Sequence, residues 1–472
     1  MARPHRPKLN PPTALVLALA LALTACAGLP SDDQARPAPL EDQARPAPLA
    51  VGASPTLPAP QSRLILTLNI ARAVGWPAGA QPQAAPGLQV QALARGLNHP
   101  RWLLVLPNGD VLVAESNAPA KPAGSLRGWI MKQVMALAGA GVPSADRITL
   151  LRDADGDGVA ETRSVFIDGL TSPFGMALVG HDLYVANTDA VLRFAYIPGA
   201  TRLVGPGERV AELPAGPINH HWTKNLLASP DGRHLYATVG SNSNIGENGL
   251  AAEAGRAAIV EIDLASRSQR PFATGLRNPN GLAWEPGSGT LWTVVNERDE
   301  LGDDLVPDYL TSVQDGAFYG WPYSYFGTRI DTRVAPQNPG LVARAIAPDY
   351  ALGAHVAALG LAIAAPADWP APFRQGGAFI GEHGSWNRQP RSGYQVVFVP
   401  FAQGRPTGLP VPVLSGFLNA DGQAQGRPVG VAFDSRGALL VADDVGNAVW
   451  RVGPLPQVPG VPAAAPVSAS KP

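Results

Sequence analysis

The strongest constraint on this chain is a pattern that occurs six times between residues 99 and 444. Each copy has a polar turn, an apolar strand, a turn rich in Asp, Asn or Gly, and a second β-rich strand, which together predict a β-hairpin. The copies start about 50 to 80 residues apart, which leaves room for a four-stranded blade with its loops. They are HPRWLLVLPNGDVLVAE (99–115), SPFGMALVGHDLYVAN (172–187), HWTKNLLASPDGRHLYATVG (221–240), RNPNGLAWEPGSGTLWTVVNE (277–297), HVAALGLAIAAPADWPAPFRQGGAFIGEHG (355–384) and RPVGVAFDSRGALLVADD (427–444).

Repeated hairpins of this kind predict an all-β fold. The 472 residues include 51 Gly and 49 Pro, a composition that favours short strands and turns over long helices. A parallel α/β barrel would need a helix after every strand, and the sequence does not offer those helices. We therefore predict a six-bladed β-propeller of four-stranded antiparallel blades over residues 88–455. One helical pattern, residues 126–139, is predicted to be a short insertion in the first blade.

The N-terminus has the pattern of a lipoprotein signal peptide. Basic residues precede an apolar run, residues 13–22, which closes with Leu23-Thr24-Ala25-Cys26. This run is shorter than the roughly 20 residues that a membrane-spanning helix needs, and a Cys buried at the end of a core helix is the other alternative. We predict that residues 1–25 are removed and that Cys26 carries a lipid. Ala27 then directs the protein to the outer membrane, facing the periplasm.

Two segments lack a pattern that would form a core. Residues 33–40 read DQARPAPL, residues 42–49 repeat the same string, and Pro and Ala remain frequent beyond it. Because Pro fixes φ and little apolar surface is available, we predict that residues 26–87 form an extended tether. The C-terminal tail, residues 456–472, is predicted to be disordered for the same reason.

The charge balance argues against nucleic acid as a partner. The formal net charge is −1 at pH 7 and charged residues make up 15% of the chain, so no basic surface is expected. Cys26 is the single cysteine, so the chain cannot form an internal disulfide.

The turn that precedes each inner strand carries the candidate functional residues. In a propeller the innermost strands surround a central channel, and side chains at their beginnings project into its mouth. Three His and two Arg residues would meet there, in a concave polar site able to bind an anion and to move a proton. The alternative is that these side chains cap loop carbonyls in an inert rim. The aligned residues are His99, Ser172, His221, Arg277, His355 and Arg427.

Several strings in the chain resemble a known family. HWTKNL (221–226), GLRNPNGLAW (275–284), VNERDELGDD (295–304) and YGWP (319–322) resemble the soluble quinoprotein glucose/sorbosone dehydrogenases. These are six-bladed propellers that use pyrroloquinoline quinone (PQQ) with calcium. The similarity covers roughly residues 88–452 and is closest to the sorbosone dehydrogenase branch. That branch also shares LLRDADGDGVAE (150–161), HHWTKN (220–225) and GEHGSWNR (381–388).

The resemblance implies separate roles for three residues. His221 matches the general base that takes the proton of the sugar C1 hydroxyl while hydride passes to the quinone. Arg277 matches the residue that stabilises negative charge on the quinone oxygen. Asn278 matches a contact of PQQ.

The cationic part of the predicted cofactor pocket departs from the family. Where the glucose dehydrogenases have a Lys and a second Arg, this chain has Gly384 and Val429. Arg427 matches one of the family's cationic residues. The missing charge could come from one of three other side chains, which are Lys224, His383 and Arg388.

Two acidic segments are candidates for calcium. In the family the ion beside the cofactor is held mainly by backbone carbonyls, which the resemblance places at Arg298 and Asp299; a solvated acidic turn is the alternative. The second segment has carboxylates at alternate positions and Gly156 at position six, but it lacks the final Glu and the flanking helices of an EF-hand. It is either a structural Ca²⁺ site or an unmetallated Asx-turn. Its carboxylates belong to Asp153, Asp155, Asp157 and Glu161.

The sequence therefore predicts a PQQ- and calcium-dependent periplasmic oxidoreductase. It would oxidise an aldose or a related, sorbosone-like sugar aldehyde and pass electrons to a periplasmic or membrane acceptor. A cofactor-free propeller that binds carbohydrate or a protein partner is one alternative. A calcium-dependent lactonase-type hydrolase is another, but it needs carboxylates and amides around a channel metal, where the aligned turns offer His and Arg.

Overall fold

The computed structural model describes residues 50–61, 67–120, 133 and 135–456. Cys26, the predicted signal peptide and the predicted C-terminal tail after residue 456 lie outside these residues. Most of the predicted helical insertion lies outside them as well, although residues 135–137 are helical. Within the described residues no helix is both long enough and apolar enough to cross a membrane.

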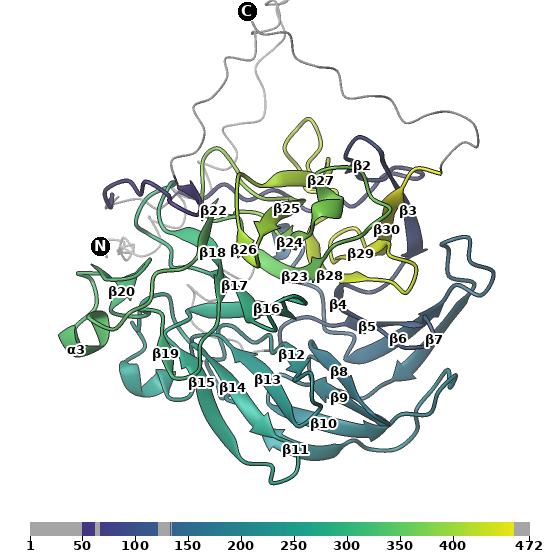
Figure 1. Ribbon diagram of the computed structural model, residues 1–472, viewed down its shortest axis with the longest axis horizontal. Coiled ribbons are helices and arrows are strands. Elements are labelled where there is room, and N and C mark those ends of the chain that lie inside the picture. The colour runs from purple at the N-terminus through teal and green to yellow at the C-terminus, as the bar shows by residue number, and fades with distance from the viewer. Residues whose placement is uncertain (1–49, 62–66, 121–132, 134, 457–472) are drawn as a thin grey trace, which may run out of the picture. The chain divides into compact units, whose positions relative to one another are not determined.

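The described strands form six blades around a common axis, which confirms the predicted propeller (Figure 1). Each predicted hairpin supplies the first two strands of one blade. The first strands contact each other in chain order, and the last contacts the first, so the ring is closed. Phe174, Leu359 and Val429, from three different blades, belong to one buried apolar cluster. These apolar side chains therefore meet inside the ring.

The bounds of the strands follow the chain from blade A to blade F. Blade A contains β4 (Pro100–Val105), β5 (Val111–Glu115), β6 (Arg147–Arg152) and β7 (Thr162–Ile167). Blade B contains β8 (Met176–Val179), β9 (Asp182–Ala186), β10 (Ala190–Ala195) and β11 (Glu208–Glu212). Blade C contains β12 (Leu226–Ala228), β13 (His234–Val239), β14 (Ala258–Asp263), β15 (Gln269–Thr274) and β19 (Ala317–Phe318).

The second half of the ring carries more additions. Blade D contains β16 (Asn278–Trp284), β17 (Leu291–Asn296), β18 (Pro307–Ser312), β22 (Tyr350–Ala354) and β1 (Val51–Gly52). Blade E contains β23 (Ala358–Ala364), β24 (Gly377–Glu382), β25 (Gln395–Ala402), β27 (Val411–Ser415), β2 (Gln83–Ala84) and β26 (Arg405–Pro406). Blade F contains β28 (Pro428–Phe433), β29 (Leu439–Asp443), β30 (Ala448–Pro454) and β3 (Leu88–Arg95). Outside the blades lie β20 (Ser324–Tyr325), β21 (Arg329–Ile330), α3 (Pro339–Val342) and the 3₁₀ helices η1 (Leu250–Glu253) and η2 (Phe373–Gln375).

Blade F joins the two ends of the propeller. Its outer strand, β3, comes from the N-terminal side and pairs antiparallel with β30, with Leu88 opposite Pro454 and Arg95 opposite Ala448. Leu88, Val90 and Leu93 of β3 are buried. The ring therefore cannot open without breaking this ladder and exposing these side chains.

Part of the segment predicted as a free tether packs on the propeller. β1 pairs with β22 of blade D, and β2 pairs with β27 of blade E. Trp76 packs edge-to-face on Phe417 and Trp450 and donates from Nε1 to Asp443 Oδ2 at 2.7 Å. The tether prediction for residues 26–87 therefore does not hold for residues 50–61 and 67–87. The outer strands β22 and β27 have unpaired backbone groups, with which β1 and β2 form hydrogen bonds. Trp76 packs on buried aromatic side chains, and the Pro and Ala content of the segment gave no indication of this contact.

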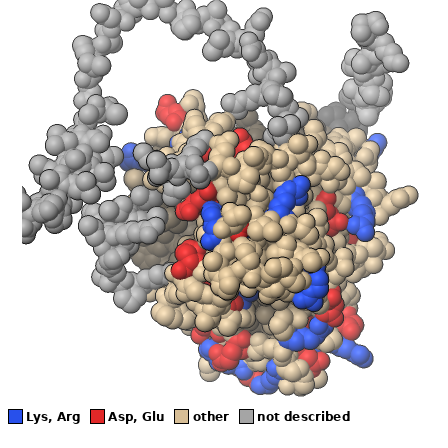
Figure 2. Space-filling view, turned by 90° about the vertical axis from the view of Figure 1, so that its left-hand side faces the viewer, with Lys and Arg blue, Asp and Glu red and all other residues tan. Residues whose placement is uncertain are grey.

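Charged side chains of both signs are mixed on the surface. Lys and Arg lie among Asp and Glu on the face shown in Figure 2. Several form ion pairs between neighbouring strands, such as Arg270 with Glu261 at 2.8 Å and with Asp315 at 2.5 Å. This mixture accords with the net charge of −1.

Close packing of the inner strands depends on glycine. A Cβ added to Gly360 would lie 2.2 Å from the carbonyl oxygen of Val429, and one added to Gly430 would lie 2.8 Å from the carbonyl oxygen of Arg101. These contacts are with backbone atoms of the next blade, which cannot move without shifting a strand.

We expect Gly360→Ala to destabilise the protein by about 1–3 kcal/mol, because the methyl group forces two inner strands apart. The measurement is the melting temperature. Gly340→Ala is the matched control, since the nearest atom to its added Cβ lies at 3.6 Å and its φ is not positive. Equal melting temperatures for the two variants would contradict this account of the ring.

Candidate functional site

We call the end of the ring at which the first strands of the blades begin its mouth. Because the first two strands are antiparallel, the beginning of the first lies beside the end of the second. Asn278 is opposite Asn296 in blade D, and Pro428 is opposite Asp443 in blade F. The residues that precede the inner strands therefore meet polar residues that follow the second strands.

His221, in the loop before β12, is held in one tautomer. Its Nδ1 lies 2.8 Å from the carbonyl oxygen of Ser241 and 3.1 Å from Ser241 Oγ. The Ser241 hydroxyl itself donates to the carbonyl oxygen of Ser243 at 2.7 Å, so its oxygen accepts from Nδ1. The ring proton is therefore on Nδ1, and Nε2 keeps its lone pair. Burial, together with the nearby His220 and Arg277, holds the pKa of His221 well below its usual value.

Ser241 also connects His221 to the next blade. Its amide donates to the carbonyl oxygen of Arg277 at 2.8 Å. The preceding residue, Gly240, has no room for a side chain: a Cβ would lie 2.3 Å from Asn278 Oδ1 and 2.5 Å from His221 Cβ. The structure thus brings His221, Arg277 and Asn278 together, as the aligned turns predict. Asn278 Oδ1 is buried and has no hydrogen-bond partner among the described residues.

The guanidinium of Arg277 is held by residues that follow β13 in blade C and β17 in blade D. Nη1 donates to the carbonyl oxygen of Glu297 at 2.6 Å. Nη2 donates to Asn244 Oδ1 at 3.0 Å and to Asp299 Oδ2 at 3.2 Å. Arg277 is therefore a positioned cation at the mouth.

A second histidine, His355, carries protons on both ring nitrogens, whereas His221 carries one. Its Nε2 lies 3.0 Å from the carbonyl oxygen of Gly302, and its Nδ1 lies 3.4 Å from Asp299 Oδ1. Both nitrogens face acceptors, so both carry protons. Burial opposes the charge, but the contact with Asp299 outweighs it and raises the pKa of His355. Burial would likewise raise the pKa of Asp299, but His355 and Arg277 lower it to about 2.

At pH 6 we expect His221 to be neutral with its proton on Nδ1 and His355 to be doubly protonated. The lowered pKa of His221 keeps it uncharged below pH 6.5, and the raised pKa of His355 keeps it charged there. Ring ¹⁵N shifts of histidine-labelled protein, assigned with His221→Ala and His355→Ala, measure both states. A charged His221 ring at this pH would contradict the assignment.

The other two cationic candidates, Lys224 and Arg388, have different surroundings. Lys224 is completely buried, with Nζ 3.4 Å from the carbonyl oxygen of His221, and burial holds its pKa well below the usual value. Arg388 lies at the rim and donates to the carbonyl oxygen of Asp303 at 2.9 Å and to Asp304 Oδ1 at 2.7 Å. Both side chains are bound to oxygens of the protein, and their role as the missing cations of the cofactor pocket stays a prediction.

Two further candidates lie around Asp444, at the end of β29. His383 Nε2 is 2.9 Å from Asp444 Oδ2, and Arg101 Nη1 contacts the same oxygen. Burial lowers the pKa of His383 despite the opposing effect of Asp444. Arg427 lies nearby and donates from Nη2 to the carbonyl oxygen of Ala71 at 3.2 Å. Arg427 and Arg101 therefore supply the positive charge on the blade F side, and His383, with its lowered pKa, lies beside them as a neutral ring.

The two departures from the family pattern have a structural reason. A Cβ added to Gly384 would lie 2.3 Å from the ring of Tyr394, so no lysine fits at this position. The guanidinium carbon of Arg427 lies 5.2 Å from the centre of the same ring. Val429 belongs to the apolar cluster inside the ring.

One of the two backbone carbonyls proposed for calcium, that of Asp299, is already bound by side chains in this structure. The carbonyl oxygen of Asp299 already accepts from Asn244 Nδ2 at 3.3 Å and from Arg333 Nη1 at 3.1 Å. Arg298 is buried and binds Glu297 and Asp331. The sequence could not show this because Arg333 is more than thirty residues further along the chain.

The other acidic segment gathers its carboxylates as predicted. The four carboxylate groups offer oxygens within 4.8 Å of one another. Asp153 also accepts from the amides of Gly156 at 2.8 Å and Gly158 at 2.9 Å and contacts Arg436. The cluster can therefore exist with a cation or as a hydrogen-bonded turn, and calcium there stays a prediction. Its members are Asp153, Asp155, Asp157 and Glu161.

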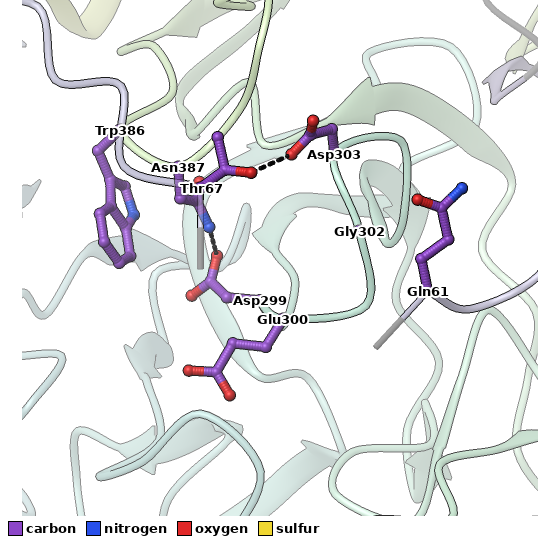
Figure 3. Close-up of a pocket in the computed structure, with 8 residues that line it drawn as sticks. All are labelled: Gln61, Thr67, Asp299, Glu300, Gly302, Asp303, Trp386 and Asn387. Carbon is purple, nitrogen blue, oxygen red and sulfur yellow. Dashed lines mark hydrogen bonds between the residues drawn. The ribbon is translucent and has the colours of Figure 1, made fainter. Parts of the chain in front are cut away.

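A small hollow opens beside Asp299 (Figure 3). Asn387 Nδ2 donates to Asp299 Oδ1 at 2.8 Å, and Thr67 donates to Asp303 Oδ1 at 2.8 Å. Trp386 also lines it and is 36% exposed, which leaves an aromatic surface suited to a flat ring or a sugar. The lining residues are Gln61, Thr67, Asp299, Glu300, Gly302, Asp303, Trp386 and Asn387.

The chain is similar to PQQ-dependent and carbohydrate-active propellers. It is 26% identical over 312 residues to a PQQ-dependent pyranose dehydrogenase from Coprinopsis cinerea, a match that covers 50% of this chain and 41% of that protein. It is 29% identical over 247 residues to an uncharacterized protein from Borreliella burgdorferi, covering 51% of this chain and 63% of that protein. The chain thus spans less than two thirds of the length of these relatives.

Solved structures show the same fold. A Trichoderma reesei protein of carbohydrate-active enzyme family AA12, in its calcium structure, has a TM-score of 0.64 at 19% identity, covering 82% of this chain and 99% of that chain. The holo form of the PQQ domain of the C. cinerea pyranose dehydrogenase has a TM-score of 0.62 at 20% identity, covering 81% of this chain and 100% of that chain. Residues 143–315 and 337–454 match the TrAA12-like family. The chain belongs to this family of propellers.

Proposed function

We propose that the protein is a PQQ-dependent oxidoreductase that oxidises an aldose or a related sugar aldehyde, with His221 as the general base. One observation carries the proposal: a neutral histidine with an available Nε2 lies beside a fixed guanidinium and an unpartnered amide oxygen. The similarity to a PQQ-dependent pyranose dehydrogenase supports the cofactor and the substrate class.

The residues at the mouth fit a planar polyanionic quinone. Asn278 has a buried, unpartnered oxygen, and Gly240 leaves no side chain between it and His221. Arg277 would lie beside the quinone, while Arg427 and His383 would face its carboxylates. PQQ, when bound, would accept the hydride, with its two electrons, that leaves the sugar C1.

His221 would act on the C1 hydroxyl of the sugar. Its Nε2 takes the hydroxyl proton, which turns the ring into an imidazolium. Nδ1–H remains on the carbonyl oxygen of Ser241, and this contact stabilises the charge that develops. Arg277 is held by carbonyl and carboxylate oxygens and so needs no rearrangement to stabilise negative charge nearby.

We also propose that Cys26 carries a lipid that anchors the protein to the outer membrane, facing the periplasm. Electrons would then pass to a periplasmic or membrane acceptor. The signal-peptide pattern supports both statements.

The test is to titrate purified protein with PQQ, follow the visible spectrum, and then add a redox dye and a panel of aldoses and sugar aldehydes. We expect quinone binding and sugar-dependent dye reduction. Carbohydrate binding without PQQ binding would favour the cofactor-free propeller, and hydrolysis of a sugar lactone in the presence of Ca²⁺ would favour a lactonase. Either outcome would overturn the proposed function.

A further inference from the structure

We infer that the guanidinium of Arg333 takes the place of a calcium ion at the loop that contains Arg298 and Asp299, so that this chain binds its quinone without calcium there. The inference rests on the proposed function for the role of the loop, but the occupancy of the loop can be tested without PQQ.

Two carbonyl oxygens of this loop, those of Asp299 and Glu300, are already bound to a cation. Arg333 Nη1 donates to the carbonyl oxygen of Asp299 at 3.1 Å and is 3.4 Å from that of Glu300. Asn244 Nδ2 takes the second lone pair of the Asp299 carbonyl, at 3.3 Å. Calcium binds oxygen at about 2.3–2.6 Å and needs six to eight ligands, so an ion on the Asp299 carbonyl would lie against the guanidinium and repel it.

Arg333 is anchored in this position. Its Nε and Nη2 donate to the two oxygens of Asp331 at 2.9 and 2.7 Å, a bidentate contact that fixes the plane of the guanidinium. Asp331 is buried and also accepts from Arg298 Nη1 at 3.2 Å. Only 25% of the Arg333 side chain is exposed. The contact with the carbonyls is therefore part of a connected network and not a loose surface contact.

The charges in direct contact at this loop leave no negative excess. Three carboxylates pair with three guanidinium groups and with the protonated ring of His355, and several of these side chains are completely buried. A divalent cation would add two positive charges to a set that has no negative excess. The carboxylates and guanidinium groups belong to Glu297, Asp299, Asp331, Arg277, Arg298 and Arg333.

The first measurement uses apoprotein treated with EDTA and carrying D155N and D157N, which disable the separate acidic cluster. We expect this protein to bind no ⁴⁵Ca²⁺ and to bind PQQ with an affinity that added Ca²⁺ changes by less than about twofold. Binding of one calcium per chain, or an increase in PQQ affinity of about tenfold or more on adding calcium, would overturn the inference.

The second measurement adds Arg333→Ala to the same background. Removal of the guanidinium frees the Asp299 and Glu300 carbonyls, so we expect PQQ affinity without calcium to fall by about tenfold and added calcium to restore it. Arg329→Ala is the control, because Arg329 is exposed and its Nη1 donates to the carbonyl oxygen of Phe326 within its own hairpin. Unchanged PQQ affinity in Arg333→Ala without calcium would contradict the inference.

Two safeguards keep the test decisive. If Arg333→Ala does not fold, Arg333→Lys keeps a charge but loses the bidentate contact, and it should show a smaller effect of the same sign. No effect in a folded Arg333→Lys would count against the inference. If no form of the protein binds PQQ, the proposed function fails, while ⁴⁵Ca²⁺ binding by the apoproteins still decides whether Arg333 excludes calcium.

Discussion

Replacing His221 with Ala should leave PQQ bound and lower kcat by about 10²–10⁴-fold. The variant removes the free Nε2 but keeps the partners of the site: Ser241 still binds the carbonyl oxygen of Arg277, and Arg277 still binds Glu297 and Asp299. The measurement is dye-linked sugar oxidation at saturating PQQ, with cofactor binding followed by its visible spectrum.

His220→Ala is the matched control. His220 is exposed and its ring lies 4.7 Å from that of His221, so its removal tests whether loss of a neighbouring imidazole is enough to stop turnover. We expect near-normal kcat for this variant. Normal turnover in His221→Ala would show that the base is assigned to the wrong residue.

Arg298→Ala should destabilise the protein by about 3–5 kcal/mol, because it leaves the buried carboxylate of Glu297 without its partner. The Arg298 guanidinium is fully buried, binds Glu297 Oε2 at 2.9 Å, and donates to the carbonyl oxygens of Pro322 at 2.8 Å and Ser324 at 2.6 Å. Asp331 keeps Arg333, but Glu297 loses its only ion pair among the described residues. Unfolding in urea measures the effect, and exposed Arg329→Ala should change stability little. A small effect in Arg298→Ala would show that this network contributes little.

The propeller was predictable because its signal is local and repeated. Each hairpin of the sequence pattern became the inner half of a blade, and the turns before two neighbouring inner strands bring His221, Arg277 and Asn278 together. His221, Arg277 and Asn278 follow directly from that alignment. The packing of Trp76 was not predictable in the same way, because a single aromatic residue in a Pro-rich segment does not reveal the distant Asp443 that it binds.

The residues that the alignment missed lie at the ends of the second strands. Ser241 fixes the tautomer of His221, Asn244 and Asp299 hold Arg277, and Asn387 binds Asp299. A signal was present in the polar run SNSN (241–244), since an antiparallel hairpin places the end of its second strand beside the start of its first. Pairings between residues far apart in the sequence, such as Arg333 with the Asp299 carbonyl, depend on three-dimensional contacts that no local pattern encodes.

The most direct test of the central claim is an anaerobic reaction of PQQ-loaded protein with an aldose deuterated at C1. The account predicts that the sugar reduces the bound quinone, that reduction is slower with deuterium than with hydrogen at C1, and that the rate falls as pH drops through the lowered pKa of His221. A protein that binds no PQQ, or a bound quinone that no aldose or sugar aldehyde reduces, would contradict it.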